Sequence, residues 1–148
     1  MTREDEKLLL KDLCARLPYG VKCLVNYTFC NETTDYKDVK ASDVDTLIMI
    51  NQQTEDYFFK QLSEWFTVDE FKPYLFPISS MTEEQKEFIK NKFCYDWDIN
   101  DHPYSLWANC IETGKADELI DWFLENNFDY RGLIPMGLAN DATGLNIY

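Results

Sequence analysis

Apolar residues near the start of the chain recur three or four positions apart, as they do on one face of a helix. They are Leu9, Leu10, Leu13, Cys14 and Leu17. Thr2 stands before this pattern, and Asp5 follows three residues later in the spacing of a capping box. Pro18 and Gly20 lie just beyond the pattern and oppose its continuation. The sequence therefore predicts an amphipathic helix over residues 3–16.

The pattern then changes to the alternation of apolar and polar residues that is typical of strands. Residues 20–28 alternate in this way, and their apolar positions include valines and a tyrosine. The short apolar run at 45–51 is typical of a buried strand. Between these two lies a polar stretch, 30–45, which we interpret as a loop or hairpin connection with a weak strand near Tyr36.

The middle of the chain has a less regular pattern. Residues 55–71 fit either a helix face or strands, and we favour strands, including one near 64–68. Pro73 and Pro77 forbid a helix interior at their positions. Residues 72–80 are therefore expected to form an extended connector over the core.

Two further helices and one strand are predicted after this connector. Residues 80–93 have a helical pattern with two alternative capping boxes, which begin at Ser80 or at Thr82. Their apolar stripe is narrow, so this helix is expected to lie on the surface. Residues 93–99 alternate as a strand does, and residues 115–127 predict a last helix.

The last 21 residues, 128–148, are unusually apolar for the end of a sequence. Proline and glycine in 134–137, and aspartate and glycine in 141–144, have the positions that they take in type I turns. Residues 145–148 alternate and predict a short strand. We therefore expect this tail to complete the fold.

Together these elements predict one α+β domain over residues 1–148. Its expected form is a small antiparallel β-sheet, for which an SH3-like partial barrel is one arrangement, with about three packed α-helices. A length of 148 residues suits a single domain, and 45% hydrophobic residues supply a core.

The chain carries a formal net charge of −13, from 27 acidic and 14 basic residues. Phosphate backbones attract clusters of Lys and Arg, so direct binding of nucleic acid is not expected. Two interpretations of the acidic surface stay open. It could keep the protein soluble and monomeric, or it could imitate a nucleic acid toward a basic protein.

The sequence favours a cytoplasmic setting without a membrane segment. It has no signal peptide and no run of about 20 apolar residues. Its five cysteines have no C-x-x-C spacing, which is typical of reduced thiols in a cytoplasmic protein.

No motif for catalysis, metal binding or nucleotide binding is complete. His102 has no cysteine near it in sequence, although folding could bring Cys94 or Cys110 close. A calcium-loop pattern that begins at Asp96 lacks the required glycine and the closing glutamate, and the phosphate-loop pattern fails around Gly114. We therefore expect no enzyme, no metal and no cofactor, with a small enzyme using these thiols, the histidine and carboxylates as an alternative.

Three blocks of the sequence resemble a family of uncharacterised small acidic proteins of Bacteroidales gut bacteria, their phages and mobile elements. The blocks are "LCARLPYGVK" at 13–22, "KPYLFPISSMTEEQ" at 72–85 and "FDYRGLIPMGLANDATGLNIY" at 128–148. Asn140 departs from the pattern, because an apolar residue is more usual there. The resemblance implies a phage or mobile-element origin and a cytoplasmic setting, and it carries no known activity.

The expected function is that of a small protein-binding or regulatory module that acts on a host or phage protein. A basic nucleic-acid-binding protein is one such partner, and a virion-associated structural protein is an alternative. The residues expected to contact a partner are acidic side chains of the middle of the chain and two residues of the tail: Asp35, Asp38, Asp43, Asp45, Glu55, Asp56, Tyr130 and Arg131. For Arg131, pairing with a carboxylate inside the fold is the favoured alternative.

Overall fold

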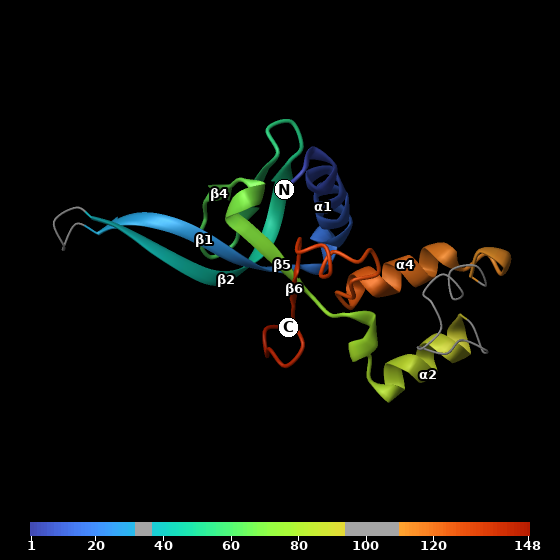
Figure 1. The fold of residues 1–148 in the computed structure, drawn as a ribbon. Helices are drawn as coiled ribbons and strands as arrows, with labels where there is room; N and C mark the ends of the chain where they lie inside the picture. Colours follow the sequence, from blue (N-terminus) through green and yellow to red (C-terminus); the bar gives the residue numbers. More distant parts are fainter. Residues whose placement is uncertain (32–36, 94–109) are drawn as a thin grey trace.

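A computed structural model describes residues 1–31, 37–93 and 110–148. Within these residues the chain forms a six-stranded sheet, three complete α-helices and a helical end at 110–112 (Figure 1). The helices are α1 (Arg3–Arg16), α2 (Glu83–Lys92) and α4 (Ala116–Glu125). The predicted α+β class with a mostly antiparallel sheet is confirmed. In this described part of the chain, no helix is both long and apolar enough to cross a membrane.

The sheet has the strand order β4-β3-β2-β1-β5-β6. Its strands are β1 (Lys22–Asn31), β2 (Lys37–Asn51), β3 (Asp56–Phe59), β4 (Trp65–Phe66), β5 (Phe71–Leu75) and β6 (Asn140–Asp141). Strands β1 to β4 form an antiparallel meander. One turn of 3-10 helix, η2 (Val68–Glu70), then leads to β5, which pairs with the other edge of β1. This connectivity agrees with the SH3-like partial barrel suggested by the sequence.

Strands β1 and β2 form a long hairpin that extends away from the three helices (Figure 1). Their register runs without interruption from Lys22 opposite Thr46 to Asn31 opposite Lys37. The prediction of a connection over 30–45 is therefore wrong in extent, because β2 begins at Lys37. Several side chains of this hairpin are exposed to solvent. Where a strand does not cover a core, its residues need not alternate between apolar and polar, and hydrogen bonds to the neighbouring strand stabilise it.

Helix α1 has the predicted bounds and the predicted capping box between Thr2 and Asp5. It buries Leu9 and Leu13 in a first core against the sheet, called here the sheet core. A short 3-10 turn, η1 (Leu17–Tyr19), follows and ends at Gly20, whose φ of 73° is left-handed.

The segment predicted as a connector, 72–80, lies largely in the sheet. Its first half belongs to β5, where Pro73 stands opposite Cys23. Proline lacks an N–H group, and this position is the last of the β1–β5 register, where a lost donor costs least. The 3-10 turn η3 (Ile78–Ser80) then leads to α2, whose cap is Thr82.

Helix α2 helps to form a second core, called here the helix core. Its members come from α2, α4 and the segments beside them: Met81, Ile89, Phe93, Cys110, Leu119, Phe123 and Phe128. The predicted surface position of this helix is confirmed, because Ile89 is its only buried residue and Phe88 is 42% exposed. Its narrow apolar stripe packs in the helix core. The predicted strand at 93–99 lies outside the described residues, apart from Phe93.

The tail completes the sheet, but not as the strand that was predicted at 145–148. The turn at 134–137 is confirmed by a bond of 2.9 Å from Gly137 N to Ile134 O. Strand β6 lies earlier than expected, at Asn140–Asp141, and pairs in parallel with β5. After it, Ala142 N donates to Leu75 O at 2.8 Å, and the chain turns away from the sheet.

Tyr148 ties the tail to two strands at once. Its hydroxyl accepts a hydrogen bond from Lys22 N at 3.1 Å and donates one to Tyr74 O at 2.6 Å. These two groups belong to β1 and β5, directly beyond the last pair of the register that joins those strands. Burial raises the pKa of this hydroxyl, so it stays protonated and can donate. The tyrosine thus bridges the strands where their own ladder stops.

Asp45 of β2 holds the turn between β3 and β4. Its side chain is buried, and its carboxylate accepts hydrogen bonds from the backbone N–H groups of Thr46, Gln61 and Leu62 at 2.6 to 3.0 Å. An Asp45→Ala substitution leaves these donors without their acceptor. We expect it to lower the free energy of unfolding by on the order of 3 kcal/mol in urea denaturation. The exposed Asp69→Ala is the control, and equal losses in the two variants would contradict this role.

Deletion of residues 141–148 is expected to destabilise the whole domain, because it removes half of β6, the Ala142 contact and the Tyr148 bridge. The substitution Tyr148→Phe removes only the two hydroxyl bonds and should cost about 1–2 kcal/mol. Thermal unfolding followed by circular dichroism measures both, with Asn146→Ala as the control in the same tail. Unchanged melting of the truncated chain would show that the tail is not part of the cooperative fold.

Candidate functional site

A groove of about 630 Å³ runs between the long hairpin and the segment of β4 and η2. Both of its walls come from the meander, so the strand register determines its shape. The hairpin wall consists of Asn26, Tyr27, Thr28, Lys40, Ala41 and Ser42, and the opposite wall of Glu64, Trp65, Phe66, Asp69 and Glu70.

The groove is acidic along one wall. Glu64, Asp69 and Glu70 have exposed side chains there, and Lys40 is the one basic residue among those that line it. Glu70 is held in place, because its carboxylate accepts from the backbone N–H of Thr67 at 2.8 Å in a capping box around η2. The wall therefore offers negative charge, and the carboxylate of Glu70 has a defined position in it.

An exposed aromatic side chain stands in the same wall. Trp65 is 46% exposed, and its ring packs against Phe58 with 5.2 Å between centroids. The two-residue strand β4 alternates, so that Phe66 points into the sheet core while Trp65 faces outward. A half-exposed indole beside carboxylates offers both apolar area and a ring face for a cation.

The hairpin wall adds a hydroxyl and a carboxylate that act together. Tyr27 lines the groove, and its hydroxyl donates to Asp43 Oδ2 at 2.5 Å. This hydrogen bond raises the pKa of Tyr27. Asp43, one of the residues predicted to contact a partner, is exposed and lies at the margin of the groove.

This groove is not lined by the other predicted acidic residues whose side chains the structure describes, Asp45, Glu55 and Asp56. Asp45 is 1% exposed and its carboxylate is engaged by backbone N–H groups, so its predicted contact with a partner is wrong. Glu55 lies in the turn between β2 and β3 and has a φ of 57°, and Asp56 is the first residue of β3. Asp35 lies outside the described residues. Asp38 pairs with Cys30 in the hairpin, and its side chain is not described.

The two predicted tail residues belong to a buried network. Arg131 Nε donates to Asp12 Oδ1 at 3.1 Å, so the favoured pairing with a carboxylate is confirmed. Asp12 also binds Arg16, whose Nε lies 2.6 Å from Oδ2. The guanidinium of Arg131 lies 4.8 Å from the ring centroid of Tyr130, a ring that stacks on Phe123. Through these contacts both residues belong to the packing of the fold, and they do not form an open docking patch.

Sequence reasoning did not single out Trp65, Glu64 or Asp69 as functional. The signal available for Trp65 was its place next to Phe66, since adjacent strand residues face opposite sides of a sheet. One of two neighbouring bulky aromatics must therefore be exposed or covered by another element. That Glu64 and Asp69 share a wall with it depends on the turn of η2, which carries no such signal.

In residues 1–31, 37–93 and 110–148 there is no group of three or more His, Cys, Asp or Glu side chains that could hold a metal ion. Cys14 and Cys23 are not joined in a disulfide. Cys110 is buried in the helix core, and His102 and Cys94 lie outside the described residues.

The network around Asp12 predicts a large effect of a single substitution. Asp12→Ala leaves the fully buried Arg16 without its carboxylate and should lower the free energy of unfolding by roughly 3–5 kcal/mol. The control is Lys7→Ala, on an exposed position of the same helix. The double substitution Asp12→Leu with Arg16→Met removes both charges, and we expect it to recover part of the loss. Equal urea midpoints for Asp12→Ala and Lys7→Ala would contradict the role of this network.

No family model, no curated protein and no solved structure matches this chain. The three sequence blocks are therefore a resemblance to a family and not a demonstrated membership. The phage or mobile-element origin that they imply stays a prediction. Among the described residues, the groove beside the long hairpin combines an acidic wall with a half-exposed tryptophan.

Proposed function

We propose that the protein is a binding or regulatory module that recognises a basic segment of another protein in the groove between the hairpin and β4–η2. The observation that carries the proposal is the combination of Trp65 with Glu64, Asp69 and Glu70 on one wall. Lys and Arg side chains suit such a wall, because their stems cover apolar surface while their charged ends meet carboxylates or the ring face.

The charge of the whole chain supports the same kind of partner. A formal net charge of −13 attracts a basic protein over distances of about a Debye length, roughly 8 Å at physiological salt. Such a field mainly accelerates association and selects against acidic competitors. The groove then supplies the local contacts that a diffuse field cannot.

The resemblance to proteins of phages and mobile elements suggests where such a partner would be found. A basic partner in that setting is a host or phage protein that itself binds nucleic acid. Occupation of its basic surface by this acidic chain would regulate it by competition. The cytoplasmic setting predicted from the sequence is the compartment in which those proteins work.

The test uses a fluorescently labelled peptide rich in Lys and Arg, with an acidic peptide of equal length as the negative probe. Fluorescence anisotropy should show binding of the basic peptide that weakens as salt increases. Glu64→Gln with Asp69→Asn should weaken it by about tenfold, which corresponds to the loss of roughly 1.4 kcal/mol. Trp65→Ala should weaken it further through the lost ring contact.

The matched control removes two charges elsewhere. Glu84→Gln with Glu87→Gln alters exposed residues of α2, away from the hairpin (Figure 1), and leaves the same net charge as the groove variant. We expect this control to change the affinity by less than about twofold, because distant surface charges are largely screened. Equal losses in both variants would show that only the total charge matters. Binding that does not depend on salt would refute recognition by charge.

A further inference from the structure

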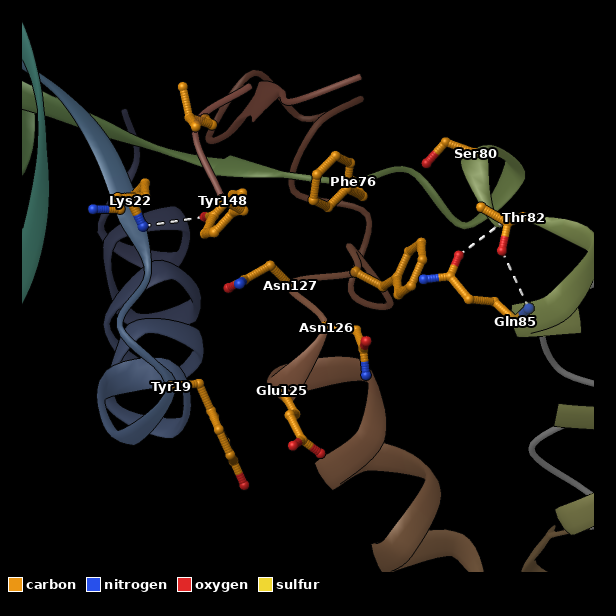
Figure 2. Close-up of a pocket in the computed structure, with 12 residues that line it drawn as sticks. Tyr19, Lys22, Phe76, Ser80, Thr82, Gln85, Glu125, Asn126, Asn127 and Tyr148 are labelled. Atoms are coloured by element: carbon orange, nitrogen blue, oxygen red, sulfur yellow. Dashed lines mark hydrogen bonds between the residues drawn. The ribbon is translucent and has the colours of Figure 1, made fainter. Parts of the chain in front are cut away.

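A second cavity, of about 780 Å³, lies where several segments of the chain meet (Figure 2). Its walls come from η1, the start of β1, the segment between β5 and α2, the first turn of α2, the end of α4, and the tail. A volume of this size is typical of a site for a small molecule.

Neutral side chains dominate the wall of this cavity, although 28% of the chain is charged. Carboxamides project from Gln85, Asn126 and Asn127, and the aromatic rings of Phe76 and Tyr148 stand among them (Figure 2). The ring of Phe128 belongs to the same wall. Two charged residues also line it. The ammonium group of Lys22 donates to Thr46 Oγ1 at 2.7 Å, and Glu125 is exposed.

Asn127 is the unusual member of this wall. It is 5% exposed, and its buried Oδ1 has no hydrogen-bond partner. Its backbone is satisfied, because its N donates to Leu124 O and its O accepts from Phe76 N. A buried acceptor without a donor costs about 1–3 kcal/mol, so such groups in folded proteins have a reason to persist. Binding of a ligand donor is such a reason.

The rings beside Asn127 are fixed rather than loose. The centroids of Phe76 and Phe128 lie 6.1 Å apart, and those of Phe76 and Tyr148 lie 5.6 Å apart. The Tyr148 hydroxyl is held between β1 and β5 by its two hydrogen bonds. Fixed aromatic rings next to a carboxamide suit a flat ligand that makes ring contacts and hydrogen bonds at once.

The charges around the cavity argue against an ionic ligand. An anion meets the exposed Glu125 and the net charge of −13 of the chain. The two charged residues among those that line the cavity, Lys22 and Glu125, carry opposite charges, so its wall has no net formal charge that would select a cation. A neutral molecule suits such a wall.

We propose that this cavity binds a small, neutral, planar molecule that carries an N–H group beside a hydrogen-bond acceptor, as nucleobases and aromatic carboxamides do. The carboxamide of Asn127 pairs with such an edge through its acceptor oxygen and its donor nitrogen, in the way that Asn pairs with adenine. The rings of Phe76, Phe128 and Tyr148 contact the faces or edges of the ligand. This site is separate from the acidic groove and does not depend on the function proposed for it.

The experiment measures binding of adenosine, uridine and nicotinamide to the full chain at millimolar concentration by saturation-transfer NMR, with titration of those that bind. AMP and UMP serve as anionic counterparts of the two nucleosides. We expect at least one neutral probe to bind, and the nucleosides to bind more tightly than their nucleotides. Preference for a nucleoside or for nicotinamide distinguishes a nucleobase site from a carboxamide site.

The decisive variant is Asn127→Gly, because glycine accepts the left-handed backbone of this position, where φ is 55°. It should weaken binding by at least about tenfold, the scale of one paired hydrogen-bonding edge. Asn127→Asp keeps the shape but replaces the donor nitrogen with a charged acceptor, and it should weaken binding as well. The control is Asn146→Gly, an exposed residue of the tail that does not line the cavity.

Circular dichroism and unfolding midpoints establish that each variant is folded before its binding is compared. Three results would overturn the proposal: no binding of any neutral probe, equal affinity of the folded Asn127→Gly variant, or tighter binding of AMP and UMP than of the nucleosides. Since Asn127 is remote from the acidic wall of Glu64 and Asp69, these results leave the proposed peptide groove unaffected.

Discussion

One buried carboxylate joins the two ends of this chain. Asp12 of α1 receives Arg16 from its own helix and Arg131 from the tail, and Arg16 also donates to the carbonyl of Phe128. Two of these charges are fully buried, and burial of charge is costly unless each partner is satisfied. The network therefore has a narrow range of geometries, and it determines where the tail lies against α1. Because Phe128 belongs to the helix core and α1 to the sheet core, the same contacts also join the two cores.

The position of the cavity beside Asn127 follows from this junction. With the tail held at Asp12, residues 138–142 reach β5 and form β6, and Tyr148 bridges β1 to β5. The cavity beside Asn127 lies between that bridge and the end of α4 (Figure 2). The hairpin is free to extend from the opposite side of the sheet, because the helices and the tail leave it uncovered (Figure 1).

The two sites differ in chemistry because different kinds of side chain line them. Exposed carboxylates line the groove beside the hairpin without the cost of desolvation, so it suits a charged partner. The cavity beside Asn127 is lined mainly by amides and rings, which need no counter-ion. A chain with a net charge of −13 can thus hold a neutral site by directing its acids outward.

The sequence by itself determined the elements whose signals are local. Helix α1, its capping box at Thr2, the box at Thr82 and the turn that ends at Gly137 depend on neighbours within four residues, so spacing alone predicts them. Only the tertiary structure decided the full length of the hairpin, because the polar strand β2 shows no alternation of apolar residues in its first part. It also decided the place of β6, which depends on a partner strand more than 60 residues away in the sequence. It also decided that Asp45 is buried among backbone donors and that Trp65, Glu64 and Asp69 share a wall. Those arrangements are contacts between distant segments, and no local pattern of residues encodes them.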